Sequence, residues 1–465
     1  MLSPRYSSFS GYGVDPKRLR HHWRQGCIPR DSPAFRFLWI GDTGTPGGRA
    51  QSEGDINVLR SRTAQQAAGF ALGSLLANAL AVIATAMLTR NLATAEFGSY
   101  SFAVSFLFFV ALFFEFGLLF PAGRLAAVAD MRDRRDIAGS ALLVYLPVGA
   151  AFSATIFGLS FWVDGWFHVG AGDALRLAAV PAFAVPFSLV LQQLAQGVDR
   201  LHVASFATVL TQFLLVARLA VWLRVGGDLD TSTAVVLRCL ALLVASACAA
   251  LWLRPLFAAV GRWGRELTRQ AREWGFQLFV GRVLSVGTYN MDVLMLGLWT
   301  DSRSVGLYVL AGSLATASGL PVIGMAAALF ARMAREASIA RRWLVGASAI
   351  GAPCALLAWL LAEPVIRIFF SARYVDAADL VLPLALAQLV RGVTGIFNAF
   401  LSAHGRGIEL RNAGIVLALS NLVFNFALIP PFGAHGAAWA SLLALVANLI
   451  AHAVFYQRSY PLLEN

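Results

Sequence analysis

Two hydrophobic segments of this chain each carry a stripe of polar residues at helical spacing. In segment 276–299 the stripe consists of Arg282, Ser285, Tyr289 and Asp292. In segment 379–402 it consists of Gln388, Arg391, Thr394 and Asn398. Residues three or four positions apart share one face of a helix. Guanidinium groups bind anions through forked hydrogen bonds, and amides and hydroxyls bind neutral polar groups. The two stripes therefore predict a polar cavity between helices that favours an anionic ligand.

A structural interpretation of the same residues stays open. Charge inside hydrocarbon costs roughly 2.5–3.5 kcal/mol per residue on insertion scales, so each intramembrane charge needs a reason. Interhelical hydrogen bonds and one buried Arg–Asp pair that fixes the packing would supply that reason. Asp292 then pairs with Arg282 or Arg391, or else it carries a coupling proton or cation. A neighbouring guanidinium keeps a buried carboxylate ionised, which favours the pairing role.

Three further charges lie in hydrophobic segments. Glu115 lies near the inner end of its segment, where its carboxylate can reach lipid headgroups. Arg238 lies near an outer end and can extend to the membrane surface. Arg218 lies deeper, so a functional and a structural role weigh equally there.

The elements that position these residues are hydrophobic runs long enough to cross a bilayer. The chain is 58% hydrophobic and 13% charged, whereas average soluble domains carry about 25% charge. A spanning helix needs about 20 apolar residues. Because lipid offers the backbone no hydrogen-bond partners, such runs form helices, in which the backbone groups bond to one another. We predict an all-α polytopic membrane protein with about twelve spans, at 66–88, 98–120, 138–162, 174–196, 203–223, 234–253, 276–299, 305–330, 343–362, 379–402, 411–430 and 435–457.

The chain has a net charge of +12, and its positive residues are distributed as in a membrane protein and not as in a nucleic-acid-binding protein. Arginines gather in alternate connections, around 124–135, 254–272 and 332–342, as the positive-inside rule describes. With an even number of spans, both termini then face the cytoplasm. The four cysteines lack metal-ligand spacing, and the chain carries no nucleotide-binding loop or hydrolase motif. We therefore expect no enzymatic activity, no cofactor and no nucleic-acid partner.

An internal repeat divides the chain into two lobes. Gly98 and Tyr100 recur as Gly306 and Tyr308, 208 positions later, and Arg124 and Arg134 recur as Arg332 and Arg342. We predict two pseudo-symmetric six-helix lobes. The predicted parts are a disordered basic tail at 1–62, an N-lobe at 63–253, an amphipathic interfacial linker at 254–275, a C-lobe at 276–458 and a C-terminal tail at 459–465.

Two parts of this division need comment. The tail at 1–62 is either a basic cytoplasmic segment that contacts anionic lipid or an extension from a start codon assigned too early. In the linker, Arg262, Arg265, Arg269 and Arg272 share one face, opposite Val260, Trp263, Leu267 and Trp274. This pattern is typical of a helix that lies in the inner membrane interface.

Several short motifs, in order along the chain, resemble the polysaccharide transporter family, the flippases for O-antigen and exopolysaccharide units within the multidrug/oligosaccharidyl-lipid/polysaccharide exporter superfamily. The motifs lie at 88–100, 292–308, 365–378, 401–405 and 429–438. The chain has Ser371 where the family pattern usually has Gly. The resemblance implies a flippase that moves an undecaprenyl-diphosphate-linked oligosaccharide to the outer leaflet of the bacterial cytoplasmic (inner) membrane by alternating access.

The resemblance also gives the polar residues their expected roles. Arg282 and Arg391 are expected to bind the diphosphate. The substrate-binding set as a whole consists of Arg282, Arg391, Tyr289, Asn398, Gln388 and Arg218, and Asp292 and Glu115 serve for coupling or ion pairing. Coupling to H⁺ or Na⁺ and partnership with the polymerase and glycosyltransferases of the pathway are further expectations. The repeated Gly-x-Tyr sites are expected at corresponding outer ends, with Gly allowing close helix approach and Tyr anchoring in the interface.

Two other functions remain as alternatives. A cation-coupled multidrug exporter of the same superfamily would share the fold, but its cavity would favour aromatic and acidic groups that hold cationic drugs. A membrane polysaccharide polymerase or ligase would carry a larger outer loop with catalytic charges, and the outer connections here are small.

Overall fold

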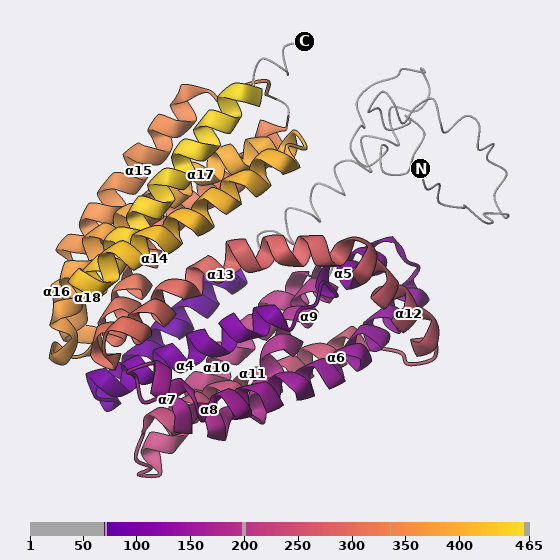
Figure 1. Cartoon of the computed structure of the whole chain (residues 1–465), viewed down its shortest axis with the longest axis horizontal. Coiled ribbons are helices and arrows are strands. Elements are labelled where there is room, and N and C mark those ends of the chain that lie inside the picture. Colours follow the sequence, from indigo (N-terminus) through magenta and orange to yellow (C-terminus); the bar gives the residue numbers. More distant parts are fainter. Residues whose placement is uncertain (1–68, 70–71, 198–200, 335, 460–465) are drawn as a thin grey trace. The chain divides into compact units, whose positions relative to one another are not determined.

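The computed structural model describes residues 69, 72–197, 201–334 and 336–459, and the described secondary structure is helical. In the N-lobe the elements are the helix Leu72–Asn91, α4 (Thr94–Phe113), α5 (Leu119–Val128), α6 (Met131–Leu159), α7 (Val163–Trp166), α8 (Gly172–Ala178), η1 (Pro181–Phe183), α9 (Ala184–Gly197), α10 (Leu201–Arg224) and α11 (Thr231–Leu253). Figure 1 shows them in indigo to magenta, side by side along most of their length. The predicted tail at 1–62 lies outside the described residues, as does the predicted tail at 459–465 except for Ser459.

The linker and the C-lobe follow in the same helical style. Their elements are α12 (Val260–Gln270), η2 (Ala271–Gly275), α13 (Phe276–Trp299), α14 (Ser302–Met333), α15 (Arg341–Leu360), α16 (Ala362–Val365), η3 (Ile366–Phe370), η4 (Ala372–Ala377), α17 (Ala378–Ala403) and α18 (Gly407–Ser459). Asp301 caps α14 by accepting a hydrogen bond from the Ser304 amide at 2.8 Å, as Asp230 does for α11 from the Thr233 amide at 3.0 Å.

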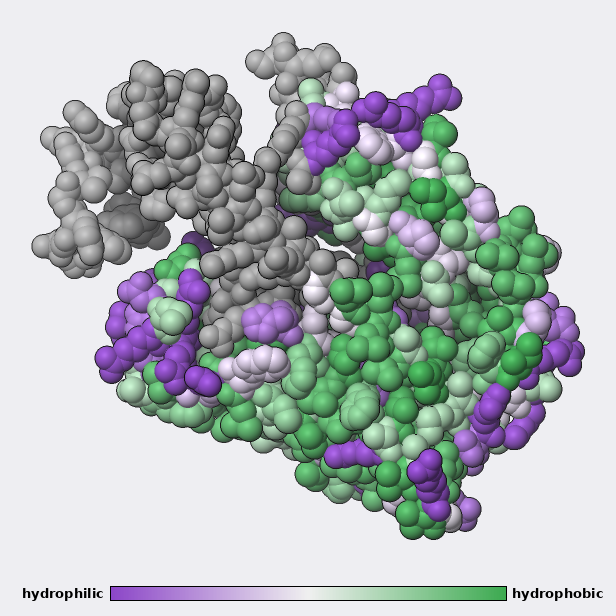
Figure 2. Space-filling view, turned by 180° about the vertical axis from the view of Figure 1, so that it is seen from behind, coloured by the Kyte–Doolittle hydropathy of each residue, from purple (hydrophilic) through white to green (hydrophobic). Residues whose placement is uncertain are grey.

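The described helices match the twelve predicted spans. Nine are long and apolar enough to cross a membrane, and the pair α8 and α9, bent by 75°, makes a tenth. The helix α13 adds the predicted seventh span, and α18, with 53 residues, divides into two spans at Gly433. Hydrophobic side chains cover most of the face in Figure 2, with hydrophilic ones towards its edges, as a membrane protein requires.

Two helix breaks have local causes. In α18 the backbone at Gly433 has φ 55°, two residues after Pro431, and Pro430 and Pro431 cannot donate helical hydrogen bonds. Between α4 and α5, Phe116 and Gly117 both have positive φ, at 44° and 72°. Such a conformation is uncommon for Phe and easy for Gly, so the second predicted span is a broken helix.

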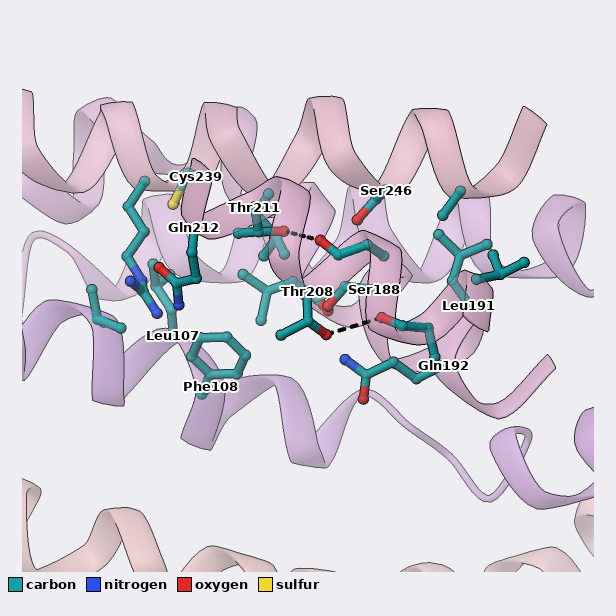
Figure 3. A pocket seen from close by; sticks show the side chains of 18 residues that line it. Leu107, Phe108, Ser188, Leu191, Gln192, Thr208, Thr211, Gln212, Cys239 and Ser246 are labelled. Atoms are coloured by element: carbon teal, nitrogen blue, oxygen red, sulfur yellow. Dashed lines mark hydrogen bonds between the residues drawn. The ribbon is translucent and has the colours of Figure 1, made fainter. Parts of the chain in front are cut away.

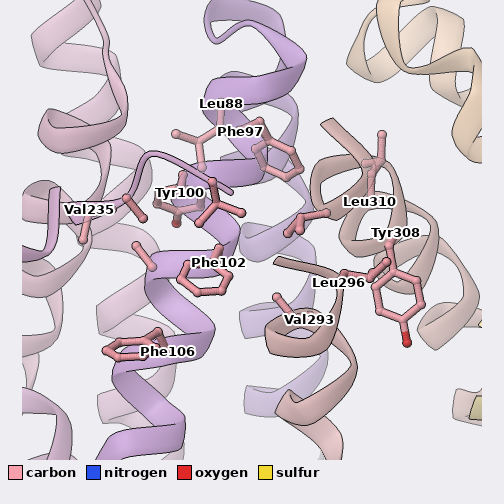
Figure 4. Packing of buried hydrophobic residues seen from close by; sticks show 14 of the residues in the cluster. Leu88, Phe97, Tyr100, Phe102, Phe106, Val235, Val293, Leu296, Tyr308 and Leu310 are labelled. Carbon is pink, nitrogen blue, oxygen red and sulfur yellow. The ribbon is translucent and has the colours of Figure 1, made fainter. Parts of the chain in front are cut away.

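The lobes share one hydrophobic core at the end of the bundle opposite the Arg-rich connections. This cluster joins N-lobe residues such as Phe97, Phe102 and Phe106 to C-lobe residues such as Leu296 and Leu310 (Figure 4). Towards the Arg-rich end the N-lobe and the C-lobe have separate clusters, around Leu142 and Leu253 in one and around Val322 and Phe400 in the other.

The repeated glycines lie against each other where the lobes meet. A methyl group added to Gly98 would overlap the Ser302 carbonyl oxygen, and one added to Gly306 would lie 2.8 Å from the Thr94 carbonyl oxygen. Each glycine thus contacts the residue four positions before the other, which is the reciprocity of a two-fold axis. The prediction that Gly permits close helix approach is confirmed.

Further contacts close this end in matching pairs. Arg90 of the N-lobe donates through Nη2 to the Ile368 carbonyl at 2.5 Å and through Nε to the Phe370 carbonyl at 3.3 Å. In the N-lobe, the His168 amide donates to the Gly297 carbonyl near the end of α13 at 2.9 Å. The end of the helix Leu72–Asn91 therefore bonds to η3 of the C-lobe, and the end of α13 bonds to the connection between α7 and α8 of the N-lobe.

The helix α12 is amphipathic, as predicted, but its apolar face has a different neighbour. Trp263 and Leu267 are buried in a core cluster with residues of α6, so this face packs on the N-lobe and not on lipid. Its arginines are exposed. Hydrogen bonds from Arg269 and Gln270 hold the pKa of Glu266 below its usual range. The side chain of Trp274, which was predicted on the apolar face, lies outside the described residues.

Candidate functional site

A cavity of about 470 Å³ lies inside the C-lobe and brings together three of the predicted polar residues, Asp292, Gln388 and Arg391. Its walls come from α13, α14, α17 and α18. The polar groups that line it are Asp292, Tyr308, Ser313, Thr316, Gln388, Arg391, Asn421 and Ser441. The cavity therefore combines one carboxylate and one guanidinium with amides and hydroxyls.

Asp292 is buried at the wall of this cavity, with an exposed fraction of 6%. One carboxylate oxygen accepts hydrogen bonds from Asn421 Nδ2 at 2.9 Å and from Asn425 Nδ2 at 2.6 Å. The other accepts from the Tyr308 hydroxyl at 2.7 Å and from the Ser441 hydroxyl. All four partners are neutral. The expectation that Asp292 pairs with an arginine is therefore wrong among the described residues, because two amides and two hydroxyls already surround the carboxylate.

A second cavity of about 240 Å³ adjoins the first, since Arg391 and Leu445 line both. Its polar lining consists of Arg391, Thr394, Asn398, Asn448 and His452. The predicted stripe on α17 is thus brought together along the two cavities, with Gln388 on the first, Asn398 on the second and Arg391 between them. Helical spacing was enough to predict this arrangement, because all four residues belong to one helix.

Arg282 lies elsewhere. Its Nε donates to Glu115 Oε1 at 2.9 Å, and Glu115 is 2% exposed. The expectations that Arg282 shares a cavity with Arg391 and that Glu115 reaches lipid headgroups are therefore both corrected. Arg282 is ten positions from Asp292, which places the two side chains about 80° apart around a helix of 3.6 residues per turn. Since α13 packs on both α4 and α18, one end of its stripe faces the N-lobe and the other faces the C-lobe.

Two other predicted residues have separate outcomes. Arg218 lines a pocket of about 380 Å³ with apolar residues of α10 and α11, away from the residues of both C-lobe cavities. The side chain of Tyr289 lies outside the described residues, as does that of Ser285, so their roles stay predictions. Among the described residues, no group of three His, Cys, Asp or Glu side chains is arranged to hold a metal ion.

The repeated tyrosines do not anchor in the membrane interface. Tyr100 and Tyr308 are 6% and 8% exposed, inside the core shared by the lobes. Tyr308 instead holds Asp292. Sequence reasoning missed this role together with those of Asn421, Asn425 and Ser441. The spacing of four between the two asparagines in an apolar helix was the signal that could have revealed them.

The N-lobe has a cavity of its own, of about 180 Å³. Its polar lining consists of Ser188, Gln192, Thr208, Thr211, Gln212, Arg238 and Ser246 (Figure 3). Thr208 and Thr211 donate to carbonyls of their own helix, so their oxygens face the cavity as acceptors. Arg238, which was expected to extend to the membrane surface, lines this cavity instead.

The family model for polysaccharide biosynthesis proteins matches residues 64–337. The chain belongs to this polysaccharide biosynthesis protein family. Among curated proteins, no relative matches the sequence. The match begins at the first predicted span and extends through α14, so it covers both repeated Gly-x-Tyr sites.

Solved structures share the fold of this polysaccharide biosynthesis protein at low sequence identity. The lipid II flippase MurJ, in an inward closed conformation, has a TM-score of 0.67 at 12% identity, covering 83% of this chain and 87% of that one. An inward-facing multidrug resistance MATE family transporter of the MOP superfamily has a TM-score of 0.68 at 15% identity, covering 83% and 95%. An outward-facing MATE family transporter has a TM-score of 0.57 at 16% identity, covering 85% and 94%. The fold is therefore that of MOP-superfamily transporters.

Proposed function

We propose that this protein is a flippase that moves an undecaprenyl-diphosphate-linked oligosaccharide across the bacterial inner membrane, for O-antigen or exopolysaccharide synthesis. The observation that carries the proposal is the C-lobe cavity, which places the Arg391 guanidinium among amides and hydroxyls inside a fold of this family. A guanidinium binds diphosphate oxygens through forked hydrogen bonds, and the amides suit sugar hydroxyls.

Alternating access between the lobes supplies the mechanism. The lobes hold together at the end opposite the Arg-rich connections, through the Gly98–Gly306 contact and the Arg90 hydrogen bonds. The positive-inside rule makes that end the outer one. The higher TM-scores with the inward conformations agree with a protein that is closed on the outside and receives its substrate from the inner leaflet.

The proposal is tested by substitutions at Arg391, measured as flipping of a labelled undecaprenyl-diphosphate saccharide in liposomes that contain the purified chain. Arg391→Glu should lower the flipping rate by about 10- to 100-fold, because it removes charge-assisted hydrogen bonds and adds repulsion. Arg391→Lys should keep part of the rate, since it keeps the charge and loses the fork. Arg458→Glu, at an exposed position near the end of α18, is the matched control and should leave the rate unchanged.

A double swap separates ligand binding from structural pairing. Because the partners of Asp292 are neutral, Arg391→Glu combined with Asp292→Arg should stay inactive. Full flipping by the double variant would mean that the two residues hold the helices together, and the diphosphate role of Arg391 would then be dropped. A wild-type chain that flips no undecaprenyl-diphosphate saccharide would remove the proposed function itself.

Asp292 is proposed as the coupling group. A buried carboxylate surrounded by neutral donors can bind a proton or Na⁺ without first breaking an ion pair. Asn425 supports this role, because it is fully buried and its Oδ1 has no hydrogen-bond partner among the described residues. That oxygen can complete the shell of a bound cation.

A cation-coupled multidrug exporter is the second candidate, and the same Asp292–Tyr308 pair favours it. An acidic group beside an aromatic ring is what a cationic drug would bind. The two candidates predict opposite results for Arg391→Gln. The flippase loses transport of its anionic lipid, whereas an exporter transports a cationic dye as well as before or better.

A further inference from the structure

Two buried polar atoms in the second C-lobe cavity have no hydrogen-bond partner among the described residues. Asn448 and His452 are 6% and 4% exposed, and both line the cavity of about 240 Å³ that Arg391 separates from the first one. Neither Asn448 Oδ1 nor His452 Nε2 makes a hydrogen bond to the described part of the protein. A buried polar atom without a partner costs free energy, so this cavity is built for something that supplies hydrogen bonds.

The hydrogen bonds already present show what the missing partner must be. His452 Nδ1 lies 2.9 Å from the Asn448 carbonyl oxygen. Because a carbonyl only accepts, Nδ1 carries the proton and donates, and Nε2 of the neutral imidazole is left as an acceptor. Asn448 Oδ1 is an acceptor as well. The cavity therefore presents two adjacent acceptors that need donors.

The charges around the cavity narrow the ligand further. The Arg391 guanidinium in the wall disfavours a cation, and no carboxylate belongs to the described lining. An anion would meet the lone pairs of Nε2 and Oδ1. The ligand that fits these acceptors is therefore a neutral molecule with hydroxyl groups. The cavity volume is that of about eight water molecules, which is enough room for one sugar ring.

We propose that Asn448 and His452 form the subsite for the sugar joined directly to the diphosphate, and that they accept hydrogen bonds from two of its hydroxyls. The inference rests on the proposed function, in which Arg391 holds the diphosphate. Arg391 lines both cavities, so phosphate bound to it places the attached sugar within reach of the second cavity. Asn398 lies on the same wall and provides a further amide for this sugar.

The test measures flipping against substrate concentration for His452→Phe and Asn448→Leu. Each variant removes one acceptor at similar volume, so the substrate concentration for half-maximal flipping should rise by about three- to tenfold. For undecaprenyl diphosphate without sugar, the same variants should flip at the wild-type rate. His435→Phe, an exposed histidine on the same helix, is the matched control and should change neither.

A second readout distinguishes this role from a structural one. Replacing a buried unpartnered polar atom by carbon should leave the melting temperature of the substrate-free protein unchanged or raise it. Asn448→Asp, which keeps an acceptor oxygen, should retain more sugar affinity than Asn448→Leu. If both apolar variants flip the saccharide lipid with wild-type affinity, the cavity holds only water and the inference is wrong. If they melt earlier and lose both substrates equally, the residues support the helices and the inference is also wrong. Failure of the wild type on both lipids would refute the proposed function instead.

Discussion

The N-lobe and C-lobe cavities lie among largely equivalent helices and differ in chemistry. The exception is α13, whose counterpart Leu72–Asn91 contributes no residue to the N-lobe cavity. The N-lobe cavity lies among α4, α9, α10 and α11, and the C-lobe cavity among α13, α14, α17 and α18. Val104 and Phe108 of the first correspond, at the repeat spacing of 208, to Gly312 and Thr316 of the second. Larger side chains therefore fill the N-lobe cavity at positions where the C-lobe leaves room.

The charged positions differ even more between the lobes. At the same spacing, Asp292 corresponds to Ala84 and Arg391 to Phe183. Asn448 and His452 correspond to Leu240 and Val244. The glycines at the lobe contact are kept in both halves, whereas none of these four polar residues has a polar counterpart at the repeat spacing. The N-lobe cavity has polar groups at other positions, among them the guanidinium of Arg238 and Gln212 Oε1, which has no hydrogen-bond partner among the described residues. The repeat therefore preserves the surfaces where the lobes meet, and the proposed substrate chemistry belongs to the C-lobe.

The largest effect is expected at the two matched glycines, which should differ in tolerance. Gly98→Ala should abolish flipping, because its methyl group overlaps the Ser302 backbone and the lobes must separate. Gly306→Ala should lower flipping less, since the added methyl group would lie 2.8 Å from its nearest neighbour, the Thr94 carbonyl oxygen. Both are measured as flipping rates, together with labelling of a cysteine at Ser302 by a membrane-impermeant thiol reagent after removal of the native cysteines.

Labelling of Ser302→Cys should rise in the Gly98→Ala background above that in the Gly306→Ala background. Equal flipping rates and equal labelling in the two backgrounds would mean that this contact does not close the protein, and that the lobes seal elsewhere.

An intermediate effect is expected at Asp292. Asp292→Asn keeps the shape and removes the charge, so the folded protein should persist while flipping driven by an H⁺ or Na⁺ gradient falls by about tenfold or more. The measurement compares flipping with and without each gradient in liposomes. Ser441→Ala, which removes one hydrogen bond to the carboxylate, should reduce gradient-driven flipping by a smaller factor. If flipping by the Asp292→Asn protein still depends fully on the gradient, another group couples the ion to transport.

The smallest effect is expected at Arg238 in the N-lobe cavity. Arg238→Gln should change the flipping rate by less than about threefold, because the proposed diphosphate site is in the other lobe and an amide keeps hydrogen-bonding capacity at this place. The assay is the one used for Arg391. A loss at Arg238 as large as that at Arg391 would show that both lobes bind the anion, and the contrast between the cavities would disappear.

The sequence predicted the α17 stripe correctly because its four residues depend on one helix alone. The α13 stripe was predicted with the same rule, but the structure divides it between the two lobes. Arg282 pairs with Glu115 of the N-lobe, whereas Asp292 accepts hydrogen bonds from Asn421 and Asn425 of the C-lobe. A helix that packs between two lobes turns a different face to each of them. Helical spacing tells which residues share a face, but it does not tell which residues that face contacts.

The amino-acid sequence by itself determined the helical membrane architecture, the repeat and the polar face of α17. Each follows from local physics, since lipid forces apolar runs into helices and 3.6 residues per turn decide which side chains share a face. Only the tertiary structure decided which charges meet. Four neutral donors come to Asp292 from two different helices. Asn448 Oδ1 and His452 Nε2 belong to a cavity that Arg391 also lines, and they have no hydrogen-bond partner among the described residues. Those arrangements depend on contacts between residues more than a hundred positions apart in several cases, and such contacts arise from packing and not from sequence spacing.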